Sequence, residues 1–222
     1  RRMDFGKLAC SGGTPVLMEP IRDGWHQITD LEKQAVMDLM DHGVLSVSKG
    51  GIVGEFEEEC AQFIGTRFGL ACCNGTSTLH SAYVAVGVGP GTEVIVPAYT
   101  WHATVTPILH CSATPVFAEI DPATLCLDPA DVERRITERT RAITVVQVWG
   151  NVPDMDRFRD LADRHGLALI EDASHAHGAT WQGKRIGSFG DIGCFSMQGG
   201  KAVSGGELGM VVTDSAELFD RM

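Results

Sequence analysis

The chain has 222 residues, of which 44% are hydrophobic, and its 18 Lys and Arg against 29 Asp and Glu give a formal net charge of −11 at pH 7. It is long and apolar enough to bury a core, and its negative field would repel nucleic acid and anionic membranes. No apolar run approaches the roughly 18 residues that span a bilayer, no signal-type segment is evident, and the seven cysteines are scattered. We therefore expect a cytoplasmic globular protein that acts on small molecules, without a nucleic-acid or membrane partner.

Two helices are predicted in the first 65 residues. Thr29 and Glu32 have the spacing of a capping box, and an apolar stripe at helical spacing follows them until Gly43. A second helix is expected to begin near Gly54 and to end before Gly65, after a polar loop at residues 46–51.

From residue 70 onward, short apolar runs alternate with helical patterns, which is typical of βαβ units and a parallel sheet. Strands are predicted at residues 70–73, 93–96, 114–117, 142–148, 167–171, 192–196 and 209–213, and helices at 79–86, 103–110 and 155–165. The pattern predicts an α/β/α sandwich, doubly wound around a mostly parallel sheet, with no linker that divides it.

Four of the predicted strands are followed by residues of unusual chemistry. In a parallel sheet the loops after the strands converge at one edge, where ligands bind. The segments at this edge are residues 75–77 (Gly-Thr-Ser), 99–102 (Tyr-Thr-Trp-His), 172–175 (Asp-Ala-Ser-His) and 196–201 (Ser-Met-Gln-Gly-Gly-Lys).

The first of these segments has the features of an anion site. Gly75, Thr76 and Ser77 open a helix whose free N–H groups and dipole favour a phosphate, although plain capping by Asn74 or Thr76 is an alternative. The familiar nucleotide motifs fail, because residues 87–91 precede a strand and Ala202 stands where a P-loop requires Ser or Thr.

Asp172 and Lys201 are the strongest candidates for chemistry. A carboxylate at the end of a buried strand needs a positive partner such as a protonated pyridine nitrogen, although Asp172 could instead cap a helix. Lys201 stands among glycines, where desolvation would lower the pKa of its amine and make it a nucleophile for Schiff-base chemistry; an exposed turn lysine is the alternative. His175 and His177 have no evident third ligand, so we expect no metal site.

The motifs in their order along the chain resemble the DegT/DnrJ/EryC1/StrS family of pyridoxal-phosphate-dependent sugar and cyclitol aminotransferases, which includes aminohydroxybenzoate synthases. The resemblance is carried by Asn74-Gly75-Thr76, residues 94–101 (VIVPAYTW), 150–156 (GNVPDMD), 171–179 (EDASHAHGA), 187–191 (GSFGD) and 195–198 (FSMQ), and by Lys201 followed by residues 204–207 (SGGE). It implies the large domain of a fold-type I pyridoxal-phosphate-dependent transferase.

Residue roles follow from the resemblance. Lys201 would bind pyridoxal 5'-phosphate as a Schiff base and later move the proton, Asp172 would pair with the pyridinium nitrogen, and His175 would lie near the phenolic oxygen. The remaining expected cofactor contacts are Trp101 against the ring, Gly75, Thr76, Ser77 and Ser196 at the phosphate, and Gln198 close to it.

The implied reaction moves an amino group from glutamate or glutamine to a nucleotide-linked keto sugar or a keto cyclitol, in amino-sugar or antibiotic biosynthesis. An aromatising lyase like 3-amino-5-hydroxybenzoate synthase and a non-catalytic relative that binds the cofactor are the alternatives. Residues 147–149 (Gln-Val-Trp) and Leu208 depart from the family pattern, which affects substrate preference more than chemistry.

The resemblance also bears on domain organisation. Residues 1–222 are expected to form one cofactor-binding large domain with an N-terminal arm, as a fragment that lacks the C-terminal small domain of the family. A homodimer with shared active sites is expected as well.

Overall fold

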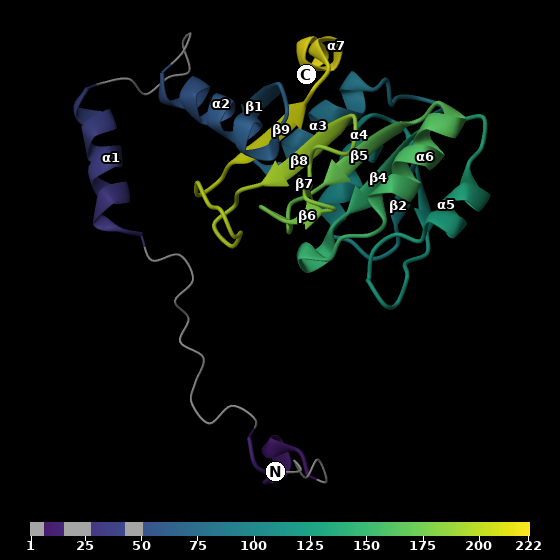
Figure 1. Ribbon diagram of the computed structural model, residues 1–222, viewed down its shortest axis with the longest axis horizontal. Helices are drawn as coiled ribbons and strands as arrows, with labels where there is room; N and C mark the ends of the chain where they lie inside the picture. Colours follow the sequence, from purple (N-terminus) through teal and green to yellow (C-terminus); the bar gives the residue numbers. More distant parts are fainter. Residues whose placement is uncertain (1–6, 16–27, 43–50) are drawn as a thin grey trace.

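The computed structural model describes residues 7–15, 28–42 and 51–222 (Figure 1). The capping box is confirmed at the start of α1 (Asp30–Asp41), where the backbone N–H of Glu32 donates to the Thr29 hydroxyl at 3.3 Å. The second predicted helix is α2 (Ile52–Ile64), and it ends at Gly65 in the left-handed conformation with φ 90°. Residues 46–50 of the predicted polar loop lie outside the described residues.

A seven-stranded sheet forms the centre of the domain. Its strand order is β1-β9-β8-β5-β4-β2-β3, and β9 alone runs antiparallel to its neighbours. The prediction of a mostly parallel sheet is therefore confirmed. The strands are β1 (Phe68–Cys72), β2 (Glu93–Pro97), β3 (Thr114–Ala118), β4 (Thr140–Val146), β5 (Ala168–Asp172), β8 (Ile192–Ser196) and β9 (Gly209–Thr213).

Helices cover both faces of the sheet, which confirms the α/β/α sandwich (Figure 1). The strands alternate between two apolar cores, so Ile143 and Leu169 face one core while Ala142 and Ile170 face the other. The helices packed on the first core are α2, α5 (Pro129–Arg135) and α6 (Met155–His165), and those on the second are α3 (Gly75–Ala85), α4 (Thr106–His110) and α7 (Ala216–Arg221).

Several short elements were not predicted from the sequence. They include α5, α7 and a hairpin of two-residue strands, β6 (Thr180–Trp181) and β7 (Lys184–Arg185). The helix predicted at residues 103–110 is divided into the 3-10 turn η2 (His102–Thr104) and α4.

The described residues include no helix that is both long and apolar enough to cross a membrane. All seven cysteines are free of disulfide bonds.

Candidate active site

The start of α3 lies against the end of β8 because Gly75 permits it. A Cβ at Gly75 would stand 2.5 Å from the Cβ of Ser196, which is closer than two carbons can approach. The glycine thus lets the first turn of α3 and the Ser196 hydroxyl share one edge of the sheet, although they are more than a hundred residues apart.

The first turn of α3 retains free hydrogen-bond donors. Asn74 caps the helix by accepting from the Ser77 N–H at 2.9 Å, and the Ser77 hydroxyl donates to the Asn74 carbonyl at 2.7 Å. Within the described part of the chain, the N–H groups of Gly75 and Thr76 and the Thr76 hydroxyl have no partner. Ser77 therefore serves the cap and does not line the cavity described below, whereas Gly75 and Thr76 do.

Asp172 ends β5 with its carboxylate held in place. It is 5% exposed, its Oδ2 accepts from the Thr104 hydroxyl at 2.7 Å, and its Oδ1 accepts from the Ser174 N–H at 3.3 Å. The neighbouring Glu171 points to the other face of the sheet and anchors the loop before β8. Its carboxylate accepts from three backbone N–H groups, those of Gly187, Phe189 and Gly190, and from the Gln147 side chain.

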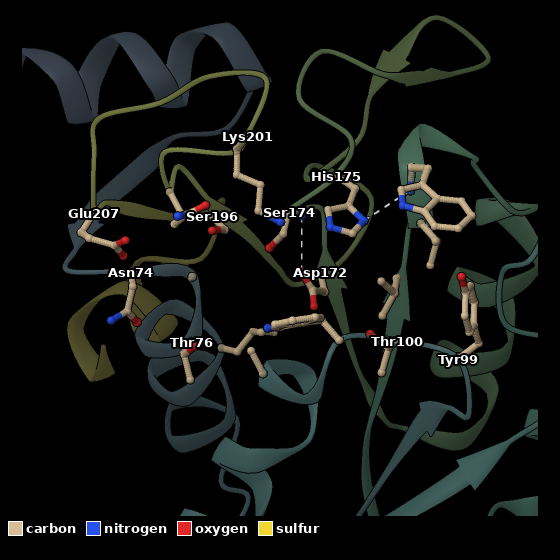
Figure 2. A pocket seen from close by; sticks show the side chains of 18 residues that line it. Asn74, Thr76, Tyr99, Thr100, Asp172, Ser174, His175, Ser196, Lys201 and Glu207 are labelled. Carbon is tan, nitrogen blue, oxygen red and sulfur yellow. Dashed lines mark hydrogen bonds between the residues drawn. The ribbon is translucent and has the colours of Figure 1, made fainter. Parts of the chain in front are cut away.

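Lys201 lies on the loop between β8 and β9, and Figure 2 shows its side chain pointing from that loop toward Ser174 and Asp172. Partial burial lowers the pKa of its amine below the ordinary 10.5, and the nearby Asp172 charge opposes that shift. Among the described residues, the amine has no hydrogen-bond or ion-pair partner. A desolvated and unpartnered amine is well suited to act as a nucleophile.

His175 is oriented by an aromatic residue of a different loop. The backbone N–H of Trp149 donates to His175 Nδ1 at 3.4 Å (Figure 2), so the neutral ring carries its proton on Nε2. Burial lowers the pKa of His175, and the Lys201 charge lowers it further. Trp149 adopts a left-handed backbone with φ 52°, and its ring meets that of Tyr99 edge-on at 6.0 Å.

These groups surround one cavity of about 730 Å³ at the carboxyl edge of the parallel strands (Figure 2). Eight of the nine predicted site residues line it: Gly75, Thr76, Trp101, Asp172, His175, Ser196, Gln198 and Lys201. The wall also includes Asn74, Tyr99, Thr100, Trp149, Ser174 and Glu207, which were not among the predicted site residues although five of them follow strands of the sheet. The described residues contain no group of three or more His, Cys, Asp and Glu side chains that could hold a metal ion.

The fold and the site together define a class of protein: an α/β/α domain that presents a free lysine and a buried aspartate at the carboxyl edge of its sheet. The chain belongs to the DegT/DnrJ/EryC1/StrS aminotransferase family, which residues 26–222 match. The resemblance noted in the sequence is thus confirmed.

Individual relatives agree with this assignment. The chain is 44% identical over 191 residues to a GDP-perosamine synthase of Caulobacter vibrioides, covering 86% of this chain and 51% of that protein. It is 43% identical over 216 residues to L-glutamine:scyllo-inosose aminotransferase of Streptomyces griseus, covering 95% of this chain and 51% of that protein. The chain thus spans about half the length of these curated relatives.

Solved structures confirm the fold. An aminotransferase from Psychrobacter cryohalolentis matches with a TM-score of 0.87 at 36% identity, over 89% of this chain and 50% of that one. A 3-amino-5-hydroxybenzoic acid synthase matches with a TM-score of 0.85 at 39% identity, over 88% of this chain and 52% of that one. The domain is therefore the α/β large domain of this family, as the sequence predicted.

Proposed function

We propose that this chain is the cofactor-binding domain of a pyridoxal-phosphate-dependent aminotransferase. The observation that carries the proposal is the convergence on one cavity of the free Lys201 amine, the buried Asp172 carboxylate and the unsatisfied N–H groups at the start of α3. An aldehyde, a pyridine nitrogen and a phosphate are complementary to these three groups.

The residues present fit such a cofactor. The free N–H groups of Gly75 and Thr76, together with the Thr76 and Ser196 hydroxyls, would hold the phosphate at the positive end of the α3 dipole. Trp101 is 68% exposed and lines the cavity, so its indole is available to cover a planar ring. A cavity of about 730 Å³ has room for a small cofactor and part of a substrate.

Once bound, the cofactor supplies an electron sink for negative charge at the carbon next to the amino group. The protein residues do the rest. Asp172 would hold a proton on the pyridine nitrogen, because its buried carboxylate stabilises positive charge beside it. Lys201 would form the covalent bond to the cofactor and then, as a free amine of lowered pKa, accept and return the proton at the substrate carbon. His175 would donate from Nε2 to the phenolic oxygen.

The proposed amino donor is glutamate or glutamine, and the proposed acceptor is a nucleotide-linked keto sugar or a keto cyclitol. The names of the relatives support both, since one is a GDP-perosamine synthase and another an L-glutamine:scyllo-inosose aminotransferase. A homodimer with shared active sites and a cytoplasmic location are part of the proposal, and the seven free cysteines agree with a reducing compartment. Residues 1–222 would form the large domain and N-terminal arm of a longer protein.

An aromatising lyase is the second candidate, and it is favoured by the likeness to 3-amino-5-hydroxybenzoic acid synthase. The two activities use the same lysine and differ in the product. Incubating the full-length protein with a keto sugar, a keto cyclitol and glutamine separates them, because only the aminotransferase forms an aminated ring without loss of water.

The proposal is tested by locating the cofactor on the chain. Borohydride reduction of the full-length protein with pyridoxal phosphate, followed by peptide mapping, is expected to find the adduct on Lys201, and Lys201→Ala should abolish it. Lys184→Ala is the control, because that amine already donates to the Ser188 carbonyl at 2.6 Å and does not line the cavity. An adduct on any other lysine in the unmodified protein would contradict the assignment.

A further inference from the structure

The carboxylate of Asp172 is bound by a buried hydroxyl from the 3-10 turn that follows β2. Thr104, at the end of η2, is completely buried and donates its hydroxyl proton to Asp172 Oδ2 at 2.7 Å. The Thr104 hydroxyl oxygen also lies 2.7 Å from the Thr100 hydroxyl oxygen. A hydroxyl has one proton to donate, so Thr100 must be the donor in that second contact. The chain of hydrogen bonds therefore runs from Thr100, on the cavity wall (Figure 2), through Thr104 to Asp172.

The backbone of Thr104 is fixed as well. The Tyr83 hydroxyl is fully buried on α3 and donates to the Thr104 carbonyl at 2.9 Å. It also lies 3.1 Å from the Thr144 hydroxyl, which by the same count of protons is its donor. Both the side chain and the carbonyl of Thr104 are therefore held by buried partners. Trp101 immediately precedes this 3-10 turn, so one rigid turn carries both the indole of the cavity wall and the support of the carboxylate.

This support decides which oxygen of Asp172 is available. Oδ2 is taken by a short bond to Thr104, whereas among the described residues Oδ1 has only the 3.3 Å contact with the Ser174 N–H. A hydrogen bond to an ionised acceptor is short and strong, so it resists rotation of the carboxylate. Oδ1 is thus the oxygen left to meet a proton donor in the cavity.

We propose that Thr104 is a positioning residue, which locks the Asp172 carboxylate so that Oδ1 faces the ring nitrogen of the cofactor. The inference rests on the proposed function. The Asp172 charge raises the pKa of four neighbouring titratable groups, namely Lys201, His175, Tyr83 and Cys194, and none of them forms a hydrogen bond with its carboxylate in the described part of the chain.

Thr104→Val removes the hydroxyl and keeps the shape of the side chain, whereas Thr104→Ser keeps the hydroxyl. In the full-length protein loaded with pyridoxal phosphate, we expect Thr104→Val to slow the half-reaction with glutamine about ten- to a hundredfold, by analogy with the loss when the hydrogen-bonded support of a metal-ligating residue is removed. The KM for glutamine should change less than about twofold, since binding of the donor is untouched. The curve of cofactor absorbance against pH should be displaced, and Thr104→Ser should restore both rate and curve.

Thr213→Val is the matched control. Thr213 is also buried and donates its hydroxyl, at 2.7 Å, to the Asp191 carbonyl, which lies outside the cavity. This variant should lose stability without a change in the absorbance curve. An unchanged curve and a normal half-reaction rate in Thr104→Val, or an equal change in Thr213→Val, would overturn the inference.

Two further measurements separate a loss of carboxylate positioning from misfolding and from a failure to bind the cofactor. If Thr104→Val does not fold, Thr100→Val removes the donor at the open end of the chain and should displace the curve in the same direction by a smaller amount; no displacement there would count against the inference. If the unmodified protein forms no reducible adduct at all, the proposed function fails instead, and the two failures are thereby distinguished.

Discussion

Burial and two neighbours of opposite charge act on the pKa of His175. Burial and the Lys201 ammonium both lower the pKa of His175 below the ordinary 6.5, while the Asp172 carboxylate acts to raise it. The ring is therefore neutral at pH 7 and becomes protonated only below its usual range. A neutral ring that accepts the Trp149 N–H at Nδ1 keeps Nε2–H as a donor toward the cavity.

This dependence predicts opposite shifts in two variants. Lys201→Ala should raise the pKa of His175 because a cation is lost, and Asp172→Asn should lower it because an anion is lost. NMR titration of the imidazole in the cofactor-free protein measures both, and Lys184→Ala should leave the midpoint where it is. Shifts of the same sign in both variants would show that the three groups do not interact as charges.

The absence of a side chain at Gly75 lets α3 approach Ser196 closely. Gly75→Ala would force a Cβ into Ser196, at 2.5 Å, and overpacking of this kind costs about 1–3 kcal/mol of stability. Gly54, in α2, has nothing within 4 Å of its would-be Cβ, so Gly54→Ala should instead stabilise by about 0.5–1 kcal/mol. Denaturant unfolding measures the two free energies. The first variant should also bind pyridoxal phosphate more weakly, and the second should bind it normally.

The boundaries of some helices and strands were predicted well from the sequence. The bounds of α6, β8 and β9 agree with prediction. A capping Asp154 and the αL Gly166 delimit α6, while Asp191 precedes the apolar run of β8 and Asp214 follows that of β9. Some short elements were not predicted. The seven-residue α5 and the β6–β7 hairpin are too short to show a hydrophobic periodicity. Ser77 was expected at the phosphate, and in the structure it forms the helix cap with Asn74. Its contact with a phosphate stays a prediction, because capping and phosphate binding use the same residue types at a helix start.

Helix α5, which was not predicted from the sequence, is anchored by a buried carboxylate. Asp131 of α5 accepts from the Glu119 N–H at 2.7 Å and pairs with Arg135 at 2.6 Å and Arg134 at 2.8 Å. The Glu119 N–H and the two arginines lower the pKa of Asp131 from 3.8 to about 2. The carboxylate thereby ties α5 to the end of β3.

The sign of this shift gives a prediction. A lowered pKa contributes stability that is complete above the ordinary value of 3.8 and is lost as the pH falls toward 2. Asp131→Asn should therefore cost on the order of 2 kcal/mol at pH 7, with the difference closing below pH 3.8. Urea unfolding at a series of pH values measures this. Asp160→Asn breaks only an exposed pair with Arg164 and should cost less than about 1 kcal/mol, so an equal cost in the two variants would contradict the account.

Across the whole molecule, the topology assembles the cavity from segments that are remote in sequence. Thr76 and Lys201, 125 residues apart, line the same cavity because α3 and the β8–β9 loop meet at one edge of the sheet. Alternating βαβ patterns were enough to predict this edge. They could not predict that β9 enters between β1 and β8 in the antiparallel direction, because hydrophobic periodicity carries no information on strand direction.

The insertion of β9 has a consequence for how the chain is made. Among the strands that the structure describes, β1 pairs with β9 alone. Phe68 lies opposite Thr213, so the ribosome must add 145 residues before that partner exists. At about 5–20 residues per second, this takes roughly 7–30 s. The first strand of the sheet to be synthesised is thus among the last to be paired, and during that interval its open edge is available to chaperones and to other nascent chains.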